Sequence, residues 1–220
     1  TFEDLFLFAL FPTIGILLTV FYMKFFTSGK LHKGNPEIVY AIAKKSSKIP
    51  PQDTYAHTIT SALTVGFGGS MGLESPMVST GAAIGSNYGT AYKLGYKERT
   101  ILLGCGASAG IAAAFNSPIA GVLFAIEVLL ADVSAAAFIP LIISAASGAL
   151  LSKIILREGI TLSFSLQQPF DYHNVPYYVL LGLLAGLVSL YYARAFTWTE
   201  QRMHRIPNRW ARAITGGLLL

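Results

Sequence analysis

Long apolar stretches separated by short polar segments dominate this chain. A helix that spans a membrane needs about 20 predominantly apolar residues. Four stretches are long and apolar enough to be candidate spans: Leu5–Met23, Thr100–Ile126, Val133–Ser152 and Asn174–Ala193. The polar stretch Arg157–Asn174 is predicted to be an exposed loop. The pattern therefore predicts an all-α, polytopic membrane protein.

Three other apolar stretches are too short to span comfortably: Pro36–Ala43, Thr58–Gly68 and Pro76–Tyr92, the last interrupted by glycines. Non-helical backbone at membrane depth is tolerated only where it is buried in protein or lines a polar cavity. Pro36 and Pro76 each suit the first turn of a helix, where the missing N–H costs nothing. Broken helices that begin near one point offer unpaired N–H groups and a positive dipole end, which suits an anion. We therefore predict re-entrant, broken helices, two of which present their N-termini to an anion.

Composition supports the membrane interpretation. The 220 residues are 53% hydrophobic and 12% charged, with a mean hydropathy of +0.55, whereas a soluble domain carries about 25% charged residues. The net charge of +5 does not indicate nucleic-acid binding, because the basic residues lie in short segments that flank apolar stretches. The single Cys105 excludes an internal disulfide. No basic leader precedes the first apolar stretch, so no cleavable signal peptide is expected, and the abrupt ends favour a fragment of a longer protein.

Glu74 is isolated in a long neighbourhood of apolar and small residues. It stands two residues before Pro76, and no other charge follows until Lys93. A helix N-terminus stabilises a carboxylate and equally stabilises an anion in its place. Protonation neutralises the carboxylate and releases it, which links permeation to pH. We therefore hypothesise that Glu74 gates an anion path; the alternative is a capping carboxylate with no role in transport.

Two matches to Gly-x-Ser-x-Gly occur, at Gly68–Gly72 and Gly106–Gly110. In a hydrolase this pattern places a nucleophilic serine on a strand-to-helix turn, so an intramembrane serine hydrolase using Ser70 or Ser108 is a further hypothesis. The base nearest to Ser70 in the sequence is His57. Neither match follows a predicted strand, and two matches in one glycine-rich chain show how weak the pattern is.

Several other residues have two interpretations or a purely structural one. Gly81, Gly85 and Gly89 recur at four-residue spacing, which favours close helix packing. Glu127 is either a functional intramembrane carboxylate or a hydrogen-bonded or hydrated group near a helix end. Asn116 is predicted to end one helix before the next begins. The histidines show no metal-ligand spacing, so neither a metal nor another cofactor is predicted.

Three segments together resemble the CLC family of chloride channels and transporters. "GLESP" at Gly72–Pro76 resembles the family's G-[KR]-E-G-P motif. "GASAGIAAAFNSPIAGVLFAIE" at Gly106–Glu127 resembles the stretch G-A-A-A-G-x-A-A-A-F-N-A-P-x-A-G-x-L-F-x-x-E, and "KGNPEI" at Lys33–Ile38 resembles G-S-G-I-P-E-[IV]. All three occur in the family's order and with similar spacing, so the resemblance covers most of the chain.

The resemblance implies a homodimer in the cell membrane, with lipid around it and an anion path in each subunit. Each path is built from two inverted halves, of which this chain would hold the first repeat at about residues 1–155 and the start of the second at about 175–220. The function implied is a voltage- or pH-gated chloride channel in which Glu74 is the gate. The anion-binding positions implied are Lys33, Gly34, Asn35, Leu73, Glu74, Ser75, Pro76 and Met77.

Departures from the family pattern bear on ion choice and on coupling. The family's anion-contacting serine aligns with Lys33, and its isoleucine aligns with Asn35. Lys33 either raises the local anion concentration or extends its ammonium into water. Proton-coupled members carry a second glutamate after the one aligned with Glu127, and Val128 stands there. A channel is therefore favoured over a chloride/proton antiporter, and the altered serine motif leaves a fluoride/proton antiporter as another alternative.

Overall fold

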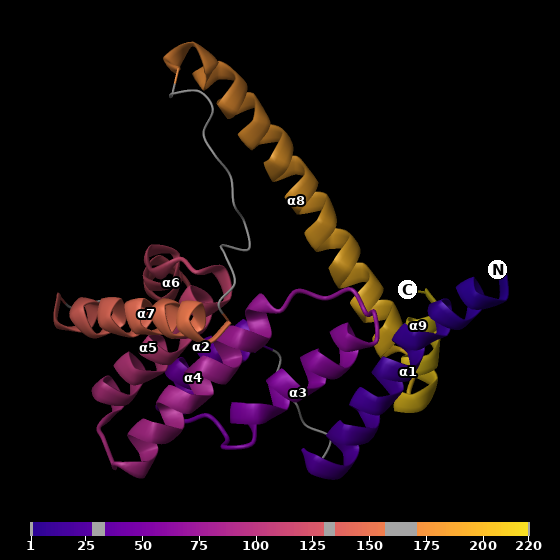
Figure 1. Ribbon diagram of the computed structural model, residues 1–220, viewed down its shortest axis with the longest axis horizontal. Coiled ribbons are helices and arrows are strands. Elements are labelled where there is room, and N and C mark those ends of the chain that lie inside the picture. Colours follow the sequence, from indigo (N-terminus) through magenta and orange to yellow (C-terminus); the bar gives the residue numbers. More distant parts are fainter. Residues whose placement is uncertain (1, 28–33, 130–134, 157–170, 220) are drawn as a thin grey trace. The chain divides into compact units, whose positions relative to one another are not determined.

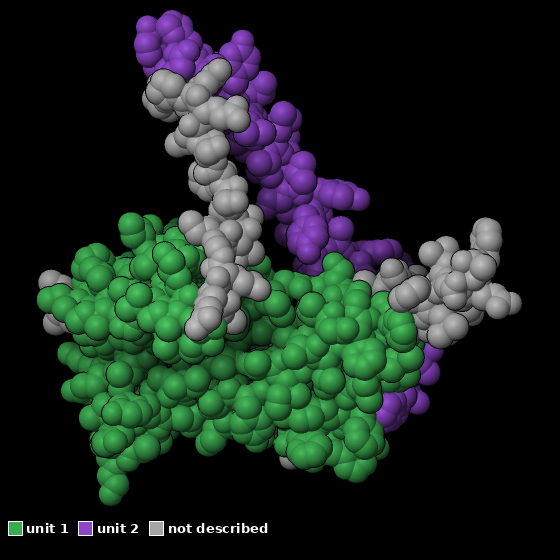
Figure 2. All heavy atoms as spheres, in the orientation of Figure 1, with its two compact units in different colours: residues 1–163 green, residues 164–220 purple. Residues whose placement is uncertain are grey.

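The computed structural model describes residues 2–27, 34–129, 135–156 and 171–219, and within these residues every regular element is a helix (Figure 1). The chain divides into two compact units, Thr1–Ser163 and Phe164–Leu220 (Figure 2). Lys33 and most of the predicted loop Arg157–Asn174 lie outside the described residues.

The first unit contains seven α-helices and one π-helical turn among its described residues. In chain order they are α1 (Phe2–Phe26), α2 (Gly34–Lys44), α3 (Asp53–Gly66), α4 (Glu74–Ala91), α5 (Tyr96–Phe115), α6 (Pro118–Phe124), the π-turn η1 (Ala125–Leu129) and α7 (Ala135–Leu156). The second unit contains the 3₁₀ turn η2 (Tyr172–Asn174), the long helix α8 (Val175–His204) and α9 (Arg209–Leu219). Among the described residues, two helical segments, Ala137–Ile155 and Tyr172–His204, are long and apolar enough to cross a membrane.

The predicted span Thr100–Ile126 is divided into α5 and α6. Asn116 adopts a left-handed conformation with φ of 50°, and the N–H of Ser117 donates to the carbonyl of Ala112 at 3.2 Å. Pro118 then begins α6, because proline is accommodated in the first turn of a helix. The prediction that Asn116 ends one helix and that another follows is confirmed.

Helices α4 and α5 pack closely through glycines. A side-chain Cβ at Gly81 would overlap the backbone of Gly106, and one at Gly85 would overlap the backbone of Leu102. Small residues allow two helix backbones to approach in this way. The predicted packing role of these glycines is confirmed, whereas the expectation that glycines interrupt Pro76–Tyr92 is wrong, because α4 is continuous through Gly89.

The core of the first unit surrounds this contact. Val78 and Ala82 of α4, Leu103 of α5 and Leu141 of α7 are fully buried. Helix α7 is also held by a hydroxyl group, because Ser144 Oγ donates to the Cys105 carbonyl at 2.8 Å. The packing therefore fixes α4 against α5 and α7, and its first turn takes its position from this core.

Candidate functional site

The first turns of α2 and α4 lie against each other. Helix α2 begins at Gly34 and α4 begins at Glu74, with Pro36 in the first turn of α2. Gly34 has φ of 57°, a left-handed conformation that glycine adopts without a steric penalty. A Cβ at Gly34 would overlap the Ser75 hydroxyl, so the two turns are in contact at this point. The two predicted helix N-termini thus come together.

The first turn of α4 offers a small set of backbone donors. The first N–H groups of a helix have no intrahelical acceptor. Pro76 has no N–H, and the N–H of Met77 donates to the Leu73 carbonyl at 3.0 Å. Of the residues predicted to bind the anion, Glu74 and Ser75 are therefore the ones in this turn that present unused helical N–H groups.

The Glu74 side chain bends back over Gly72, two residues earlier in the chain. A Cβ at Gly72 would overlap the Glu74 carboxylate, so the absence of a side chain there creates the space that the carboxylate uses. Glu74 is exposed, and no cation pairs with it among the described residues. Among the described residues, the positive end of the α4 dipole is therefore what stabilises this carboxylate. At an exposed site a helix N-terminus stabilises a negative charge by about 0.3–1 kcal/mol.

Asn35 adds a polar group beside these turns. Its Oδ1 atom is buried and has no hydrogen-bond partner among the described residues. The oxygen and nitrogen of an amide are assigned from their partners, and a half-turn of the amide would place an N–H₂ donor at the same point. Leu73 and Met77 are 44% and 38% exposed, so their side chains border the first turn of α4 without filling it.

The predicted proton-path positions lie in a different element. Glu127 and Val128 belong to η1, a single π-helical turn that extends α6, and both are exposed. π-Turns inside helices often occur at functional sites. The π-helical turn could not be predicted from the sequence, because the residues on either side of Glu127 are apolar, as in an ordinary helix.

The serines of the hydrolase hypothesis are not on strand-to-helix turns in the described residues. Ser108 is fully buried within α5 and donates to the Cys105 carbonyl at 2.9 Å. Ser70 is exposed in the segment between α3 and α4. No group of three or more metal-ligating side chains occurs in the described part of the chain.

A buried polar group that the sequence did not predict lies near α2. Asp53 and His57 of α3 are 2% and 7% exposed, and Ser79 of α4 is 4% exposed. The four-residue spacing from Asp53 to His57 to Ser61, which places polar groups on one face of α3, is the signal that could have found it.

Comparisons with known proteins agree on one family. The family model described as "Voltage gated chloride channel" matches residues 14–220. A ClcB-like chloride channel protein of Ralstonia nicotianae is 31% identical over 186 residues, which are 81% of this chain and 42% of that protein. Chloride channel protein CLC-f of Arabidopsis thaliana is 31% identical over 159 residues, which are 69% of this chain and 20% of that protein.

Two solved structures share the fold. A CLC-type fluoride/proton antiporter superposes with a TM-score of 0.80 at 26% identity, covering 99% of this chain and 55% of that one. A slow cyanobacterial Cl⁻/H⁺ antiporter superposes with a TM-score of 0.82 at 23% identity, covering 97% of this chain and 52% of that one. The chain thus spans about half of these structures, and 42% or less of the two curated relatives.

Proposed function

The chain belongs to the voltage-gated chloride channel family, and on this premise we propose that it builds the first half of a path that carries small anions, chloride first, across a membrane. Glu74 is the gate of this path. The observation that carries the proposal is the contact between the first turns of α2 and α4, where Gly34 lies against Ser75 and the Glu74 carboxylate begins α4.

The chemistry of the site suits a small anion in competition with a carboxylate. The N–H groups of Glu74 and Ser75, the Ser75 hydroxyl and a rotated Asn35 amide are donors, and both helix dipoles present their positive ends. An anion and the ionised Glu74 side chain need the same donors. Protonation removes the charge of the carboxylate and with it the attraction to the helix N-terminus, so the side chain leaves and the anion passes.

Replacing Glu74 tests the gate in the full-length protein reconstituted in lipid vesicles. We expect Glu74→Gln, which resembles the protonated side chain, to raise anion flux or to remove its pH dependence. Glu98→Gln is the matched control, because Glu98 is also exposed, lies in the first turn of α5 and bends back over a glycine, Gly95. Unchanged flux and pH response in Glu74→Gln would exclude Glu74 from the mechanism.

Passive conduction is the mode of transport that we favour. Coupled proton movement needs an ionisable relay across the hydrocarbon, and Val128 supplies no titratable atom at the position where coupled members place a carboxylate. Glu127 is its neighbour, and consecutive helical residues point about 100° apart. In vesicles with a chloride gradient and no pH gradient, a channel should move no protons uphill. Proton pumping that is lost in Glu74→Gln would establish the antiporter.

A fluoride/proton antiporter is the second candidate function. It is favoured by the 26% identity to a structure described as such an antiporter and by the departure from the serine motif at Lys33. Reversal potentials measured in chloride and in fluoride gradients separate the two ions.

The proposal also covers the oligomeric state of the protein, its membrane and the division of the chain into repeats. Two copies form a homodimer in the cell membrane, each with its own path. Residues 1–155 form the first repeat and residues 175–220 begin the second; the boundary between the compact units, at residues 163 and 164, falls between these ranges and supports the division. Crosslinking of the purified protein in membranes would test the dimer.

A further inference from the structure

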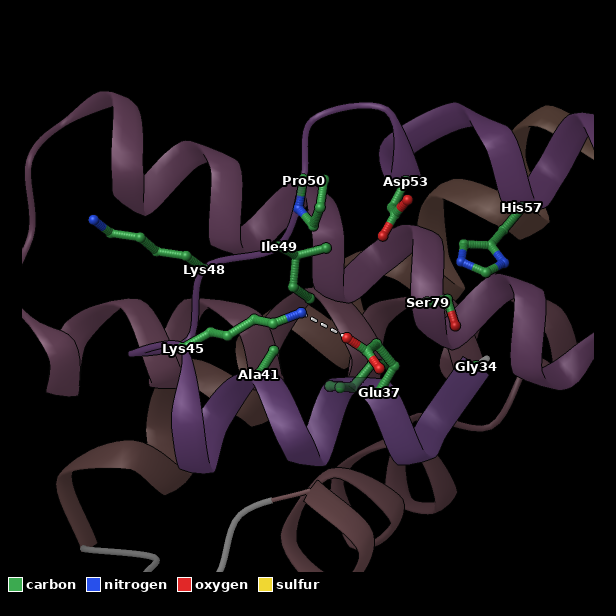
Figure 3. A pocket seen from close by; sticks show the side chains of 11 residues that line it. Gly34, Glu37, Ala41, Lys45, Lys48, Ile49, Pro50, Asp53, His57 and Ser79 are labelled. Atoms are coloured by element: carbon green, nitrogen blue, oxygen red, sulfur yellow. Dashed lines mark hydrogen bonds and ion pairs between the residues drawn. The ribbon is translucent and has the colours of Figure 1, made fainter. Parts of the chain in front are cut away.

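A small pocket with apolar and polar lining residues lies between α2, α3 and α4 in the first unit, and we call it the α2–α3 pocket. Its polar lining includes Glu37, Lys45, Lys48, Asp53, His57 and Ser79, with Gly34 at one end (Figure 3). The connection from α2 to α3 is fixed over it, because Ser86 Oγ donates to the Ser47 carbonyl at 2.6 Å. The pocket is therefore a built feature of the fold.

Ser79 gives the first indication of a ligand. Its side chain is 4% exposed, and its Oγ is buried with no hydrogen-bond partner among the described residues. Leaving a buried hydroxyl without a partner is costly, because its desolvation is not offset by a hydrogen bond, so such a group normally bonds to water. The pocket has a cavity volume of about 10 Å³ for the centres of water-sized spheres, about what a single water requires. In Figure 3 the hydroxyl lies between His57 and Gly34.

Ionisable groups surround this cavity on several sides. Asp53 and His57 of α3 are one helical turn apart and both are buried. Glu37 faces the pocket from α2, and its carboxylate pairs with the Lys45 ammonium at 2.8 Å. Lys48 belongs to the lining through the α2–α3 connection, with its ammonium extended away from the pocket in Figure 3, and α4 contributes Ser79, which does not titrate. His57 is the histidine among the described lining residues, and histidine is the residue type whose ordinary charge change falls between about pH 5 and 8.

We propose that the α2–α3 pocket is a second ionisable site, which holds one water between Ser79 Oγ and the His57 ring and which controls the anion path independently of Glu74. The inference rests on the proposed function. Gly34 connects the two sites, because it lines this pocket and also touches Ser75 in the first turn of α4. Protonation of His57 adds a positive charge to the pocket that Gly34, the first residue of α2, also lines, and so raises the local anion concentration.

The test uses the full-length Glu74→Gln protein in vesicles, in which the gate no longer titrates. We expect anion flux to be about fivefold higher at pH 5 than at pH 8, the lower end of site-to-site coupling. Adding His57→Gln should remove this difference, and adding Ser79→Ala should reduce it. Adding His173→Gln, an exposed histidine in the second unit, should leave it intact. A pH-independent Glu74→Gln flux, or a pH difference that survives His57→Gln, would overturn the inference while leaving the proposed function standing.

A second measurement does not depend on transport. In protein labelled with nitrogen-15 histidine, the His57 ring resonances should change with pH, and the midpoint of that change should move in Ser79→Ala because the bridging water is lost. A ring that keeps one protonation state, or a midpoint unchanged by Ser79→Ala, would overturn the inference. Loss of anion flux in every variant and in the unmodified protein, by contrast, would contradict the proposed function itself.

Discussion

Replacing Gly85 with alanine should destabilise the protein by forcing α4 and α5 apart. An alanine Cβ at this position would overlap the Leu102 carbonyl oxygen and would lie 2.6 Å from the Leu102 carbonyl carbon. Both partners are helix backbone, so neither can rotate away as a flexible side chain could. The strain must be relieved by separating the helices.

The required separation follows from the contact distance. Ordinary contacts of a Cβ begin at 3.4 Å, so the 2.6 Å approach to the Leu102 carbon alone must lengthen by roughly 0.8 Å, and the closer Leu102 carbonyl oxygen requires a larger separation. Such overpacking costs about 1–3 kcal/mol. The intrinsic helix preference of alanine over glycine offsets up to about 1 kcal/mol of this cost, which leaves about 0–2 kcal/mol from the local contact. Separating the helices also opens the neighbouring Gly81–Gly106 contact. We therefore expect a net loss of folding stability near the upper end of this range, at about 2 kcal/mol.

Thermal unfolding of the full-length protein in detergent measures this effect. Each kcal/mol corresponds to about 2–4 °C for 150–250 residues and to less for a longer protein, so Gly85→Ala should lower the apparent unfolding temperature of the full-length protein by a few degrees. Gly66→Ala is the control, because no atom outside the local helix backbone lies within 4 Å of a Cβ at that position of α3. Equal unfolding temperatures for Gly85→Ala and Gly66→Ala would refute the packing argument.

Two further substitutions probe the surroundings of α4 and α5. Gly110→Ala would place a Cβ 2.8 Å from the Met77 carbonyl oxygen in the first turn of α4, so it should shift the pH midpoint of anion flux more than Gly85→Ala does; an equal shift in both variants would contradict this. Ser144→Ala removes the hydrogen bond to the Cys105 carbonyl and should cost about 0.6 kcal/mol, measured as a small fall in unfolding temperature, whereas an unchanged temperature would show that the bond contributes nothing.

The helix beginnings were predictable because their signals are local. Proline fixes its own φ and lacks an N–H, so Pro36 and Pro76 each mark a first turn without reference to the rest of the chain. The four-residue spacing of Gly81 and Gly85 is likewise a property of one helix face. The same sequence could not show that these glycines leave α4 continuous, because glycine both weakens a helix and permits close packing. The partner backbone of α5 decides between the two effects.

The α2–α3 pocket was not predictable for the opposite reason. His57 and Ser79 lie on different helices, and nothing in either helix specifies the other as a neighbour. Ser79 is one of several small polar residues in α4, and only tertiary packing distinguishes its hydroxyl by removing every described hydrogen-bond partner. The π-turn at Glu127 and Val128 is also a tertiary outcome, since the sequence pattern there is that of an ordinary apolar helix.

The proposed gate at Glu74 requires a part of α4 that can move, and the packing of this helix differs between its middle and its first residue. Val78 and Ala82 are fully buried, and Gly81 and Gly85 touch the α5 backbone, so displacement of the whole helix would break the closest packing in the first unit. The Glu74 side chain, by contrast, is exposed and bends into the space that Gly72 leaves open because it has no side chain. The side chain can therefore rotate while the helix stays fixed. Loss of the negative charge on the Glu74 carboxylate is enough to release this side chain from the α4 N-terminus. The packing of α4 therefore favours protonation of Glu74, rather than movement of the helix, as the trigger for opening.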